Sequence, residues 1–528
     1  MSLPNLLIFV PDEMRGDVIH NPNLKIPNIR SIANDGVIFT NNFSVNPVCG
    51  PSRVCTFTGT YPMAGAHRSL FQLLRPDDEN LFKFLKEKGY EVIWIGRNDL
   101  FHETAIRVSV NKRINVIKRL IRSAILHMGF FKLIKILPKL RSSLKNLTPT
   151  PEMLETLSKF WPLNPWAINH PMRKTFYYGK CSEEQAKNSL DNAMIKAALK
   201  YLDKFSKKSK RKKNPFCLYI ALNLPHPPYC VEEPYFSLYD RKKIPPPFPS
   251  ELMNNPNFYE DKPEFMKLMR ERYGLDKITE NDFKEILAVY YGMISKIDNL
   301  FGQIIEKLKE IGEYDNTAIT FFSDHGDYAG SYGLTEKWST GMHDCLLNVP
   351  FIVKIPGIKP KKSINTELTQ TIDIFATLLE IAQVKTKYTH FSKSLLPLLK
   401  EELDTHRSVV FAQGGYDSRE PQAFEDKVSS PDNPINGIYF DKIEITHDYL
   451  NTSCRTTMIR TKEWKLNIRS MPEAKQELYN LKEDPQEFFN LIDESKYSDI
   501  IKSLKEQLLY WYLRNSDNPH YSHKRAAL

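Results

Sequence analysis

Residues 80–96 read NLFKFLKEKGYEVIWIG, which is an amphipathic run, a glycine and then a run of β-branched and aromatic residues. The first part predicts a helix, Gly89 predicts its end, and the last part predicts a buried strand. The same alternation occurs earlier, where NLLIFVPDE (5–13) and VIFTNNFSV (37–45) are typical of strands and IPNIRSIANDG (26–36) is typical of a helix. This alternation predicts a mainly parallel sheet with helices on both faces.

The alternation continues through the first three quarters of the chain. Further strands are predicted at PFCLYIALNLP (215–225), TAITFFSDHGD (317–327) and VPFIVKIPG (349–357). Long helical patterns occupy 284–312 and 367–382. The fold class is therefore α/β, with a large mainly parallel sheet sandwiched by helices.

Two segments depart from this pattern and suggest how the chain is divided. Residues 101–175 are basic and apolar together, and they predict one or two amphipathic helices inserted between elements of the sheet. From about residue 401 onward, segments such as TTMIRTKEWKLNIRS (456–470) predict short strands followed by a terminal helix. We therefore predict a larger domain at 1–400, which includes the insert, and a smaller C-terminal α+β subdomain, packed on it, at 401–528.

The charge of the chain is concentrated in one window. The chain has 528 residues and a net charge of +10, and eleven Lys and Arg residues without any acidic residue lie within 107–145. We favour a solvated helical face with a buried apolar stripe for this window. Capture of a polyanionic substrate, or contact with a membrane surface or a partner protein, are the alternatives. A nucleic-acid partner is not expected, because no recognised binding module accompanies the charges.

The compartment and the cysteines give weaker information. The N-terminal segment has no signal-peptide pattern, and no apolar run is long enough to span a membrane. The expected location is the cytoplasm, or the periplasm or exterior if a leader was removed.

The cysteines are scattered without a CxxC pair, which argues against a disulfide framework and a zinc site. Most are expected to be buried small hydrophobes. They are Cys49, Cys55, Cys181, Cys217, Cys230, Cys345 and Cys454.

Polar clusters follow the predicted strands at the points where those strands end. Asp12–Glu13, residues 97–99, His226 and Asp324–His325 each come directly after a strand. Ligands bind at the carboxyl ends of the strands in such sheets, so these clusters are expected to converge. Carboxylates with one imidazole suit a divalent cation such as Ca2+, Mg2+ or Mn2+.

The segment CGPSRVCTFTG (49–59) resembles the signature of type I sulfatases. That signature is Cys or Ser, any residue, Pro-Ser-Arg, three residues, usually Leu, and Thr-Gly; here Phe57 stands in place of Leu. VPDEMRGD (10–17), LPHPPY (224–229) and SDHGDYAGSYGLTEKW (323–338) are similar to further landmarks of the family. The resemblance spans nearly the whole chain and implies an alkaline-phosphatase-like fold and hydrolysis of sulfate esters on a small molecule or a glycan.

The resemblance implies that Cys49 is oxidised to formylglycine (3-oxoalanine) by a formylglycine-generating enzyme that recognises Pro51, Ser52 and Arg53. One hydroxyl of the hydrated aldehyde attacks sulfur and releases the alcohol, and the second hydroxyl expels sulfate as the aldehyde re-forms. A divalent metal neutralises charge and lowers the pKa of the nucleophile. Ca2+ is the first expectation, with Mg2+ or Mn2+ as alternatives.

The resemblance also implies roles for individual residues. His226 and Lys337 are expected to contact the sulfate, and one of them to protonate the leaving oxygen. Arg53 is expected to hold the diol and offset negative charge. Arg97 takes the place of the family lysine that binds the diol or the sulfate. The implied metal ligands are Asp12, Glu13, Cys49 as formylglycine, Asp324 and His325.

The sequence departs from the family at the segment after the strand of residues 91–96. Arg97, Asn98 and Asp99 stand where the family usually has Lys-x-His, so the usual histidine near the nucleophile is missing. Asp99, Asn98 or His102 are the candidates to take its place, and Asn98 and Asp99 are expected to help bind the substrate together with Arg97.

Two further departures keep other functions open. Glu13 stands where the family usually has Asp, or Gln in some branches, and His325 stands where the lysosomal branch has Asn. An Asp-His pair is common in bacterial sulfatases and in phosphonate monoester and phosphodiester hydrolases of the same fold. A phosphonate monoester or phosphodiester substrate is therefore one alternative, and a noncatalytic sulfatase-like binding protein is another.

Overall fold

The computed structural model describes most of the chain outside the insert and the C-terminal end. The described residues are 3–65, 67–114, 116, 162–167, 169–208, 214–386, 388–417, 420 and 437–516. Most of the basic window 107–145, on which three alternatives were placed, lies outside these residues.

The main sheet has eight strands in the order β11-β2-β10-β9-β1-β7-β4-β5. β10 runs antiparallel to both of its neighbours, and every other pair in this sheet is parallel. The prediction of a mainly parallel sheet is confirmed. The strands are β1 (Asn5–Asp12), β2 (Val37–Phe39), β4 (Glu91–Gly96), β5 (Lys112–Ile114), β7 (Phe216–Pro225), β9 (Thr317–Phe322), β10 (Phe351–Lys354) and β11 (Ile364–Asn365).

The segment 80–96 forms the predicted helix and strand. α4 (Leu81–Glu87) begins after Asn80, whose side-chain oxygen accepts a hydrogen bond from the backbone N–H of Lys83 at 3.0 Å. The chain then reverses at Gly89, whose φ of +99° favours glycine, and enters β4. β4 pairs in parallel with β7 over Glu91–Gly96, so the segment contributes an inner strand of the sheet.

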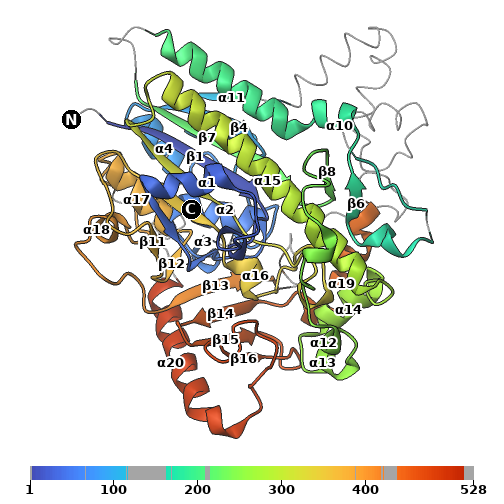
Figure 1. Cartoon of the computed structure of the whole chain (residues 1–528). Coiled ribbons are helices and arrows are strands. Elements are labelled where there is room, and N and C mark those ends of the chain that lie inside the picture. Colours follow the sequence, from blue (N-terminus) through green and yellow to red (C-terminus); the bar gives the residue numbers. More distant parts are fainter. Residues whose placement is uncertain are drawn as a thin grey trace.

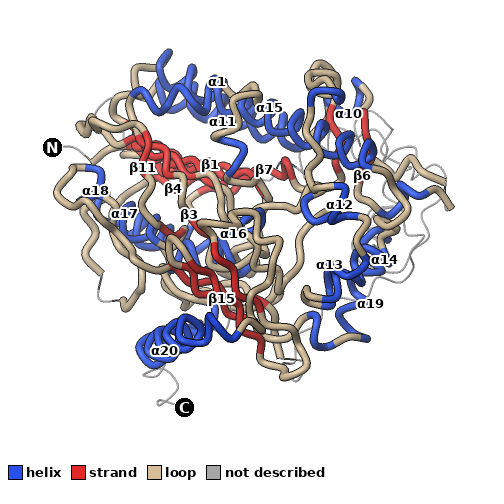
Figure 2. Tube along the Cα trace, turned by 60° about the horizontal axis from the view of Figure 1, so that its bottom comes forward, coloured by secondary structure: helices blue, strands red, loops and turns tan. Residues whose placement is uncertain are grey.

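Helices lie on both faces of the sheet (Figures 1 and 2), and each face buries a separate apolar core. Successive side chains of a strand point to opposite faces, and β1 is buried along its whole length. Leu6, Ile8 and Val10 pack with α2 (Cys49–Thr58), α4 and α17 (Asp373–Ile381). Leu7 and Phe9 pack with α11 (Leu190–Ser206) and α15 (Glu280–Glu310) on the other face. Helices therefore cover both faces, as the sequence predicts.

A small antiparallel sheet forms the C-terminal part, in the order β13-β14-β15-β16. Its strands are β13 (Val410–Gly414), β14 (Thr456–Arg460), β15 (Trp464–Arg469) and β16 (Glu477–Asn480). α19 (Phe440–Asp448) precedes β14, and α20 (Ser498–Asn515) lies along the sheet (Figure 1). Trp511 of α20 stacks on Phe411 of β13 at 4.5 Å and meets Tyr61 at 4.9 Å, which packs this part against the N-terminal part.

The remaining elements are short. Two small parallel pairs are β3 (Asn42–Phe43) with β12 (Thr369–Gln370) and β6 (Tyr177–Lys180) with β8 (Tyr229–Val231). The other α-helices are α1 (Pro27–Ser31), α3 (Pro62–Gly65), α5 (Ile106–Ser109), α10 (Glu183–Lys187), α12 (Ser250–Met253), α13 (Pro256–Glu260), α14 (Glu264–Arg272), α16 (Asp344–Leu347) and α18 (Leu396–Leu399).

Two sequence expectations need correction. Lys112–Ile114 lies in the segment expected to be helical, but it forms the edge strand β5, with Ile114 buried and Lys112 exposed. Charged side chains are tolerated there because an edge strand has one unpaired side facing solvent. Cys181 and Cys230 form a disulfide between the end of β6 and β8, so the expectation of no disulfides is wrong for this pair. Four of the five free cysteines are buried.

Within the part of the chain that the structure describes, none of the helices combines the length and the apolar character needed to cross a bilayer.

A buried ion pair at the start of α17 should contribute strongly to stability. Asp373 accepts hydrogen bonds from Arg407 Nε at 2.8 Å and from the backbone N–H of Lys393 at 2.8 Å. Asp373→Asn should lower the free energy of unfolding by about 3–5 kcal/mol, because it leaves the Arg407 guanidinium buried without its counter-charge. Urea denaturation measures this loss.

The pH dependence of that contribution follows from the same contacts. Burial raises the pKa of Asp373, but Arg407 outweighs it and holds the pKa well below its usual range. The stabilisation is therefore present above the unfolded-state pKa of about 3.9 and is lost as pH falls below it.

The control for Asp373→Asn is Lys361→Gln, which breaks the exposed pair with Glu401. Equal losses in the two variants would contradict the prediction.

Candidate functional site

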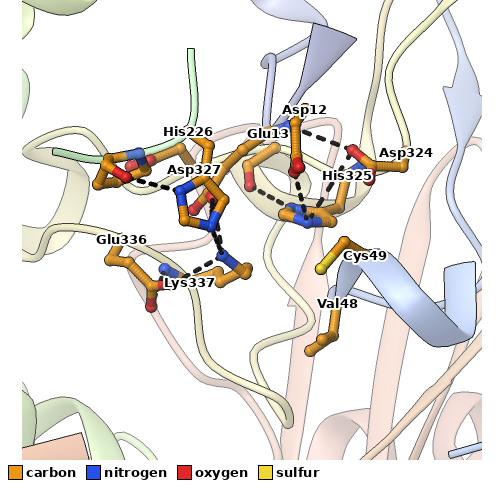
Figure 3. Close-up of polar contacts among 12 residues, drawn as sticks. Asp12, Glu13, Val48, Cys49, His226, Asp324, His325, Asp327, Glu336 and Lys337 are labelled. Carbon is orange, nitrogen blue, oxygen red and sulfur yellow. Dashed lines mark hydrogen bonds and ion pairs between the residues drawn. The ribbon is translucent and has the colours of Figure 1, made fainter. Parts of the chain in front are cut away.

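Four neighbouring strands of the main sheet bring the predicted residues to one edge. β9, β1, β7 and β4 are adjacent and parallel, so their carboxyl ends meet there. Asp324–His325, Asp12–Glu13, His226 and Arg97 lie at or just after the ends of these four strands, in that order. The convergence expected from the sequence is thus a consequence of strand order (Figure 3).

Cys49 is the first residue of α2, beside this edge. Val48 before it is extended, and its backbone N–H donates to Asn46 Oδ1 at 2.8 Å, which fixes the chain as it enters the helix. Every residue of α2 is buried, and Cys49 itself is 1% exposed. Figure 3 shows Cys49 next to His325 and Asp12, and each of these three residues offers one possible metal-ligand atom, all within 4.8 Å of one another.

Arg53 lies one turn after Cys49 and holds the carboxylates. Its Nε donates to Asp324 Oδ2 at 2.7 Å and its Nη2 lies 3.2 Å from Asp12 Oδ2. All three side chains are fully buried. Burial lowers the pKa of Arg53, but Asp324 and Asp12 outweigh it, so the guanidinium stays charged. Ser52 adds a hydrogen bond from its hydroxyl to the backbone oxygen of Asp324 at 2.6 Å.

Arg97 lies between the carboxylates and the cysteine. Its Nη1 donates to Asp12 Oδ2 at 2.5 Å, its Nε meets Asp99 at 2.5 Å, and its Nη2 lies 3.7 Å from Cys49 Sγ. Burial, with Asp99, raises the pKa of the Cys49 thiol, and Arg97 opposes this shift. A cation is thus placed beside the sulfur atom.

The inner atoms of the cluster fit a divalent cation. Asp12 Oδ1, Glu13 Oε1 and His325 Nε2 are buried and make no hydrogen bond to the described residues. His325 Nε2 lies 3.7 Å from Asp12 Oδ1 and 3.9 Å from Asp324 Oδ1, while its Nδ1 bonds the backbone oxygen of Gly326 at 2.9 Å. Buried acceptor atoms facing one another are unfavourable unless a cation joins them, and carboxylates with one oriented imidazole are suitable ligands.

Glu13 divides its two carboxylate oxygens between two neighbours. Oε2 accepts from Lys337 Nζ at 2.7 Å and lies 3.5 Å from His226 Nε2, whereas Oε1 is one of the unpaired inner atoms. Its backbone has φ of +73°, a conformation that costs free energy for a residue other than glycine. The hydroxyl of Tyr290 holds this turn by donating to the Glu13 backbone oxygen at 2.8 Å.

Lys337 and His226 lie together on the side of the site away from Asp324 (Figure 3). Lys337 Nζ is 2.7 Å from Glu336 Oε1 and 3.2 Å from His226 Nε2. His226 Nδ1 is 2.7 Å from the backbone oxygen of Pro227, which orients the ring. Burial, helped by Lys337, lowers the pKa of His226, so the ring is neutral near pH 7.

The structure separates the three candidates for the missing family histidine. Asp99 lies in the site, where it pairs with Arg97. Asn98 instead closes its own loop, because its side chain bonds both the backbone N–H and the backbone oxygen of Phe101. His102 is exposed and bonds Thr104 Oγ1 at 2.8 Å. The geometry therefore favours Asp99 and gives no support to Asn98 or His102.

The sequence reasoning missed several residues that surround the predicted set. Asp327 is fully buried and accepts from the Tyr229 hydroxyl at 2.6 Å, and burial raises its pKa to about 6. Lys442 and Tyr439 come from the start of α19 in the C-terminal part, where no motif identified them. Asp327 could have been found, because it lies three residues after Asp324 in the same loop.

Comparison with known proteins places the chain in a family. The profile described as "Sulfatase" matches residues 4–384, and the profile described as "N-sulphoglucosamine sulphohydrolase, C-terminal" matches residues 436–513. Among curated relatives, the multifunctional alkaline phosphatase superfamily protein PehA of Trinickia caryophylli is 25% identical, with 100% of this chain and 98% of the relative covered. Arylsulfatase K of Bos taurus is 24% identical over 96% of this chain and 81% of its own length.

Solved structures share the fold. The phosphonate monoester hydrolase of Agrobacterium radiobacter has a TM-score of 0.70 at 20% identity, covering 97% of this chain and 96% of that one. A protein solved with its substrate D-glucosamine-2-N,6-O-disulfate has a TM-score of 0.66 at 18% identity, covering 98% and 99%. The family profile spans well over half of the chain. The chain therefore belongs to the sulfatase family of the alkaline phosphatase superfamily, and it is a sulfuric ester hydrolase.

Proposed function

We propose that this enzyme hydrolyses sulfate esters of a small molecule or a glycan, with Cys49 as formylglycine and one divalent cation. The observation that carries the proposal is the pattern of the buried carboxylates Asp12 and Glu13. In each of them one oxygen is bound by a cationic side chain and the other has no hydrogen-bond partner among the described residues, and the unpaired oxygen of Asp12 lies 3.7 Å from His325 Nε2. That pattern, beside a cysteine at the start of a buried helix, suits a metal-assisted nucleophile.

The residues that would hold the cation are Asp12, Glu13, Asp324, His325 and residue 49. When bound, the cation would supply positive charge to the transferred group and to the nucleophile. Ca2+ is the first candidate because the set is mainly carboxylate oxygen, with Mg2+ and Mn2+ as alternatives. Formylglycine, made by a formylglycine-generating enzyme, would supply two hydroxyls on one carbon once water has added to its aldehyde.

The protein's own side chains would do the rest. Arg97 faces residue 49 and would bind a sulfate oxygen through the guanidinium. Lys337 Nζ and His226 Nε2 lie 3.2 Å apart and would contact the sulfate from the other side. The ester oxygen leaves as an alcohol after it takes a proton from one of these two groups. Arg53 would act through the carboxylates that it holds rather than by touching the substrate.

The second candidate function is hydrolysis of phosphonate monoesters or phosphodiesters. It is favoured by the Arg97–Asp99 pair beside Cys49, which replaces the usual Lys-x-His, and by the fold shared with a phosphonate monoester hydrolase. Sulfate monoesters and phosphate diesters both carry one negative charge, so the same cationic site could accept either.

Loss of the nucleophile should abolish turnover. Cys49→Ala should lower the rate on an aryl sulfate by on the order of 10³-fold or more, because no other group in the proposed mechanism can accept the sulfo group. Cys49→Ser should also fail to turn over repeatedly, because a single hydroxyl lacks the second one that expels sulfate. The assay uses protein coexpressed with a formylglycine-generating enzyme. Cys55→Ala, on the same helix, is the control, and full activity in Cys49→Ala would refute the mechanism.

Removal of one proposed ligand should weaken metal binding. His325→Ala should weaken the affinity for the activating cation by at least about ten-fold, because it deletes the only proposed imidazole ligand. Calorimetric titration of metal-free protein with Ca2+, Mg2+ and Mn2+ measures the affinity and identifies the preferred ion. His102→Ala, an exposed histidine outside the cluster, should leave the affinity unchanged. An unchanged affinity in His325→Ala would remove this residue from the ligand set.

The two candidate functions are separated by comparing rates side by side. We expect faster hydrolysis of an aryl sulfate than of an aryl phosphodiester or an aryl phosphonate monoester, with Cys49→Ala as the blank for each. Arg97→Lys restores the family residue at one position and should shift the ratio further toward sulfate. Faster phosphodiester or phosphonate turnover in the unaltered enzyme would instead establish the second candidate function.

A further inference from the structure

Glu336 joins two lysines at the edge of the site. Its Oε1 accepts from Lys337 Nζ at 2.7 Å, and its Oε2 accepts from Lys442 Nζ at 2.7 Å. The side chain of Glu336 is 1% exposed and that of Lys442 is 14% exposed. Burial raises the pKa of Glu336, but Lys337 and Lys442 outweigh it and hold the pKa at about 2. The three charges therefore form a buried chain, lysine to carboxylate to lysine.

The backbone of Glu336 has a left-handed conformation, which glycine adopts more easily than glutamate. Its φ is +64°, which favours glycine and costs free energy for a glutamate. The turn is held by hydrogen bonds from the Glu336 backbone N–H to the Tyr229 hydroxyl at 2.9 Å and from the Tyr328 backbone N–H to the Glu336 oxygen at 3.1 Å. The contacts of the Glu336 carboxylate with the two lysines therefore offset the free-energy cost of this backbone conformation.

Lys442 reaches the site from a different part of the chain. It lies on α19, and besides Glu336 it donates to the backbone oxygen of Lys337 at 3.0 Å. The backbone N–H of Lys337 donates to Glu336 Oε2 at 2.8 Å, so both ends of the active-site lysine are tied to the same pair. Tyr439 packs one turn earlier on Phe176, at a ring distance of 5.4 Å, and helps to hold this end of α19 in place.

We infer that Glu336 and Lys442 are positioning residues, through which α19 sets the place and the effective charge of Lys337. The inference rests on the proposed function of Lys337 as a sulfate contact. Glu336 alone would fix Lys337 but would also neutralise it. Lys442 supplies a second positive charge to the same carboxylate, so Glu336 is shared between two lysines and does not neutralise Lys337 alone.

The neighbours of Lys337 explain why its position needs this support. Its ammonium group also lies 2.7 Å from Glu13 Oε2 and 3.2 Å from His226 Nε2, so Glu13, Glu336 and His226 offer one acceptor to each of its three N–H groups and together set its position. Without a fixed Glu336, the lysine would move toward Glu13 and away from the place where the sulfate is expected. A displacement of about 1 Å at a catalytic group can cost on the order of 10²-fold in rate.

The test compares Lys442→Met with two matched variants. Lys442→Met removes the charge and keeps the stem of the side chain, and it should lower kcat on an aryl sulfate about ten-fold and weaken binding of inorganic sulfate about ten-fold. Lys442→Arg keeps the charge and should recover most of both. Lys174→Gln breaks the ion pair of Lys174 with Asp441, which lies on α19 like Lys442 but does not contact Glu336. This variant should leave kcat and the affinity for sulfate unchanged.

The decisive readout is the dependence on Lys337. Sulfate affinity is measured from the rise in Tm with added sulfate, which does not require turnover. In a Lys337→Ala background, Lys442→Met should cause no further loss of sulfate affinity, because a residue that acts through Lys337 has nothing left to position. Glu336→Gln should behave like Lys442→Met and covers the case in which Lys442→Met does not fold.

The outcomes separate this inference from the proposed function. Equal losses of affinity in the presence and absence of Lys337, or wild-type kcat and affinity in both Lys442→Met and Glu336→Gln, would overturn the inference alone. A wild-type enzyme that neither hydrolyses aryl sulfate nor binds sulfate would overturn the proposed function and this inference with it.

Discussion

The contact of Arg53 with Asp12 and Asp324 sets the geometry on which the rest of the site depends. The two carboxylates end neighbouring strands, β1 and β9, and the arginine lies one turn from Cys49 on α2. Because residues one turn apart share a face of a helix, seating the guanidinium on the carboxylates also fixes the distance from Cys49 to the strand ends. None of the three side chains is exposed, so a loss of any one would leave a buried charge without its partner.

The charges around that contact are arranged in two layers. The outer oxygens of Asp12 and Glu13 accept from Arg97 and Lys337, and their inner oxygens have no partner among the described residues. Burial raises the pKa of Glu13 well above its usual range, and Lys337 opposes that shift. A cation at the inner oxygens would favour the ionised form of this carboxylate further, because an opposite charge nearby stabilises it.

The sequence was most informative where one local pattern determines one structural outcome. The helix and strand of residues 80–96, the parallel sheet and the convergence of Asp12, His226 and Asp324 all follow from periodicity and from the rule that parallel strands end at one edge. Long-range contacts were less accessible. Neither the disulfide between Cys181 and Cys230 nor the edge strand β5 has a local signature, because each depends on a partner segment that is distant in the sequence.

The same limit explains why the C-terminal contribution to the site could not be read from motifs. Lys337 belongs to the region matched by the sulfatase profile, whereas Lys442 belongs to the separate match at 436–513. The two lysines are joined only through the carboxylate of Glu336, which lies in a left-handed turn. The sequence around Glu336 does not indicate that its side chain contacts a residue about a hundred positions away. The ammonium group of Lys442 can contact Glu336 only if both regions are folded against each other. Lys337 is therefore held by contacts from both parts of the chain, and the smaller part contributes a residue to the candidate site.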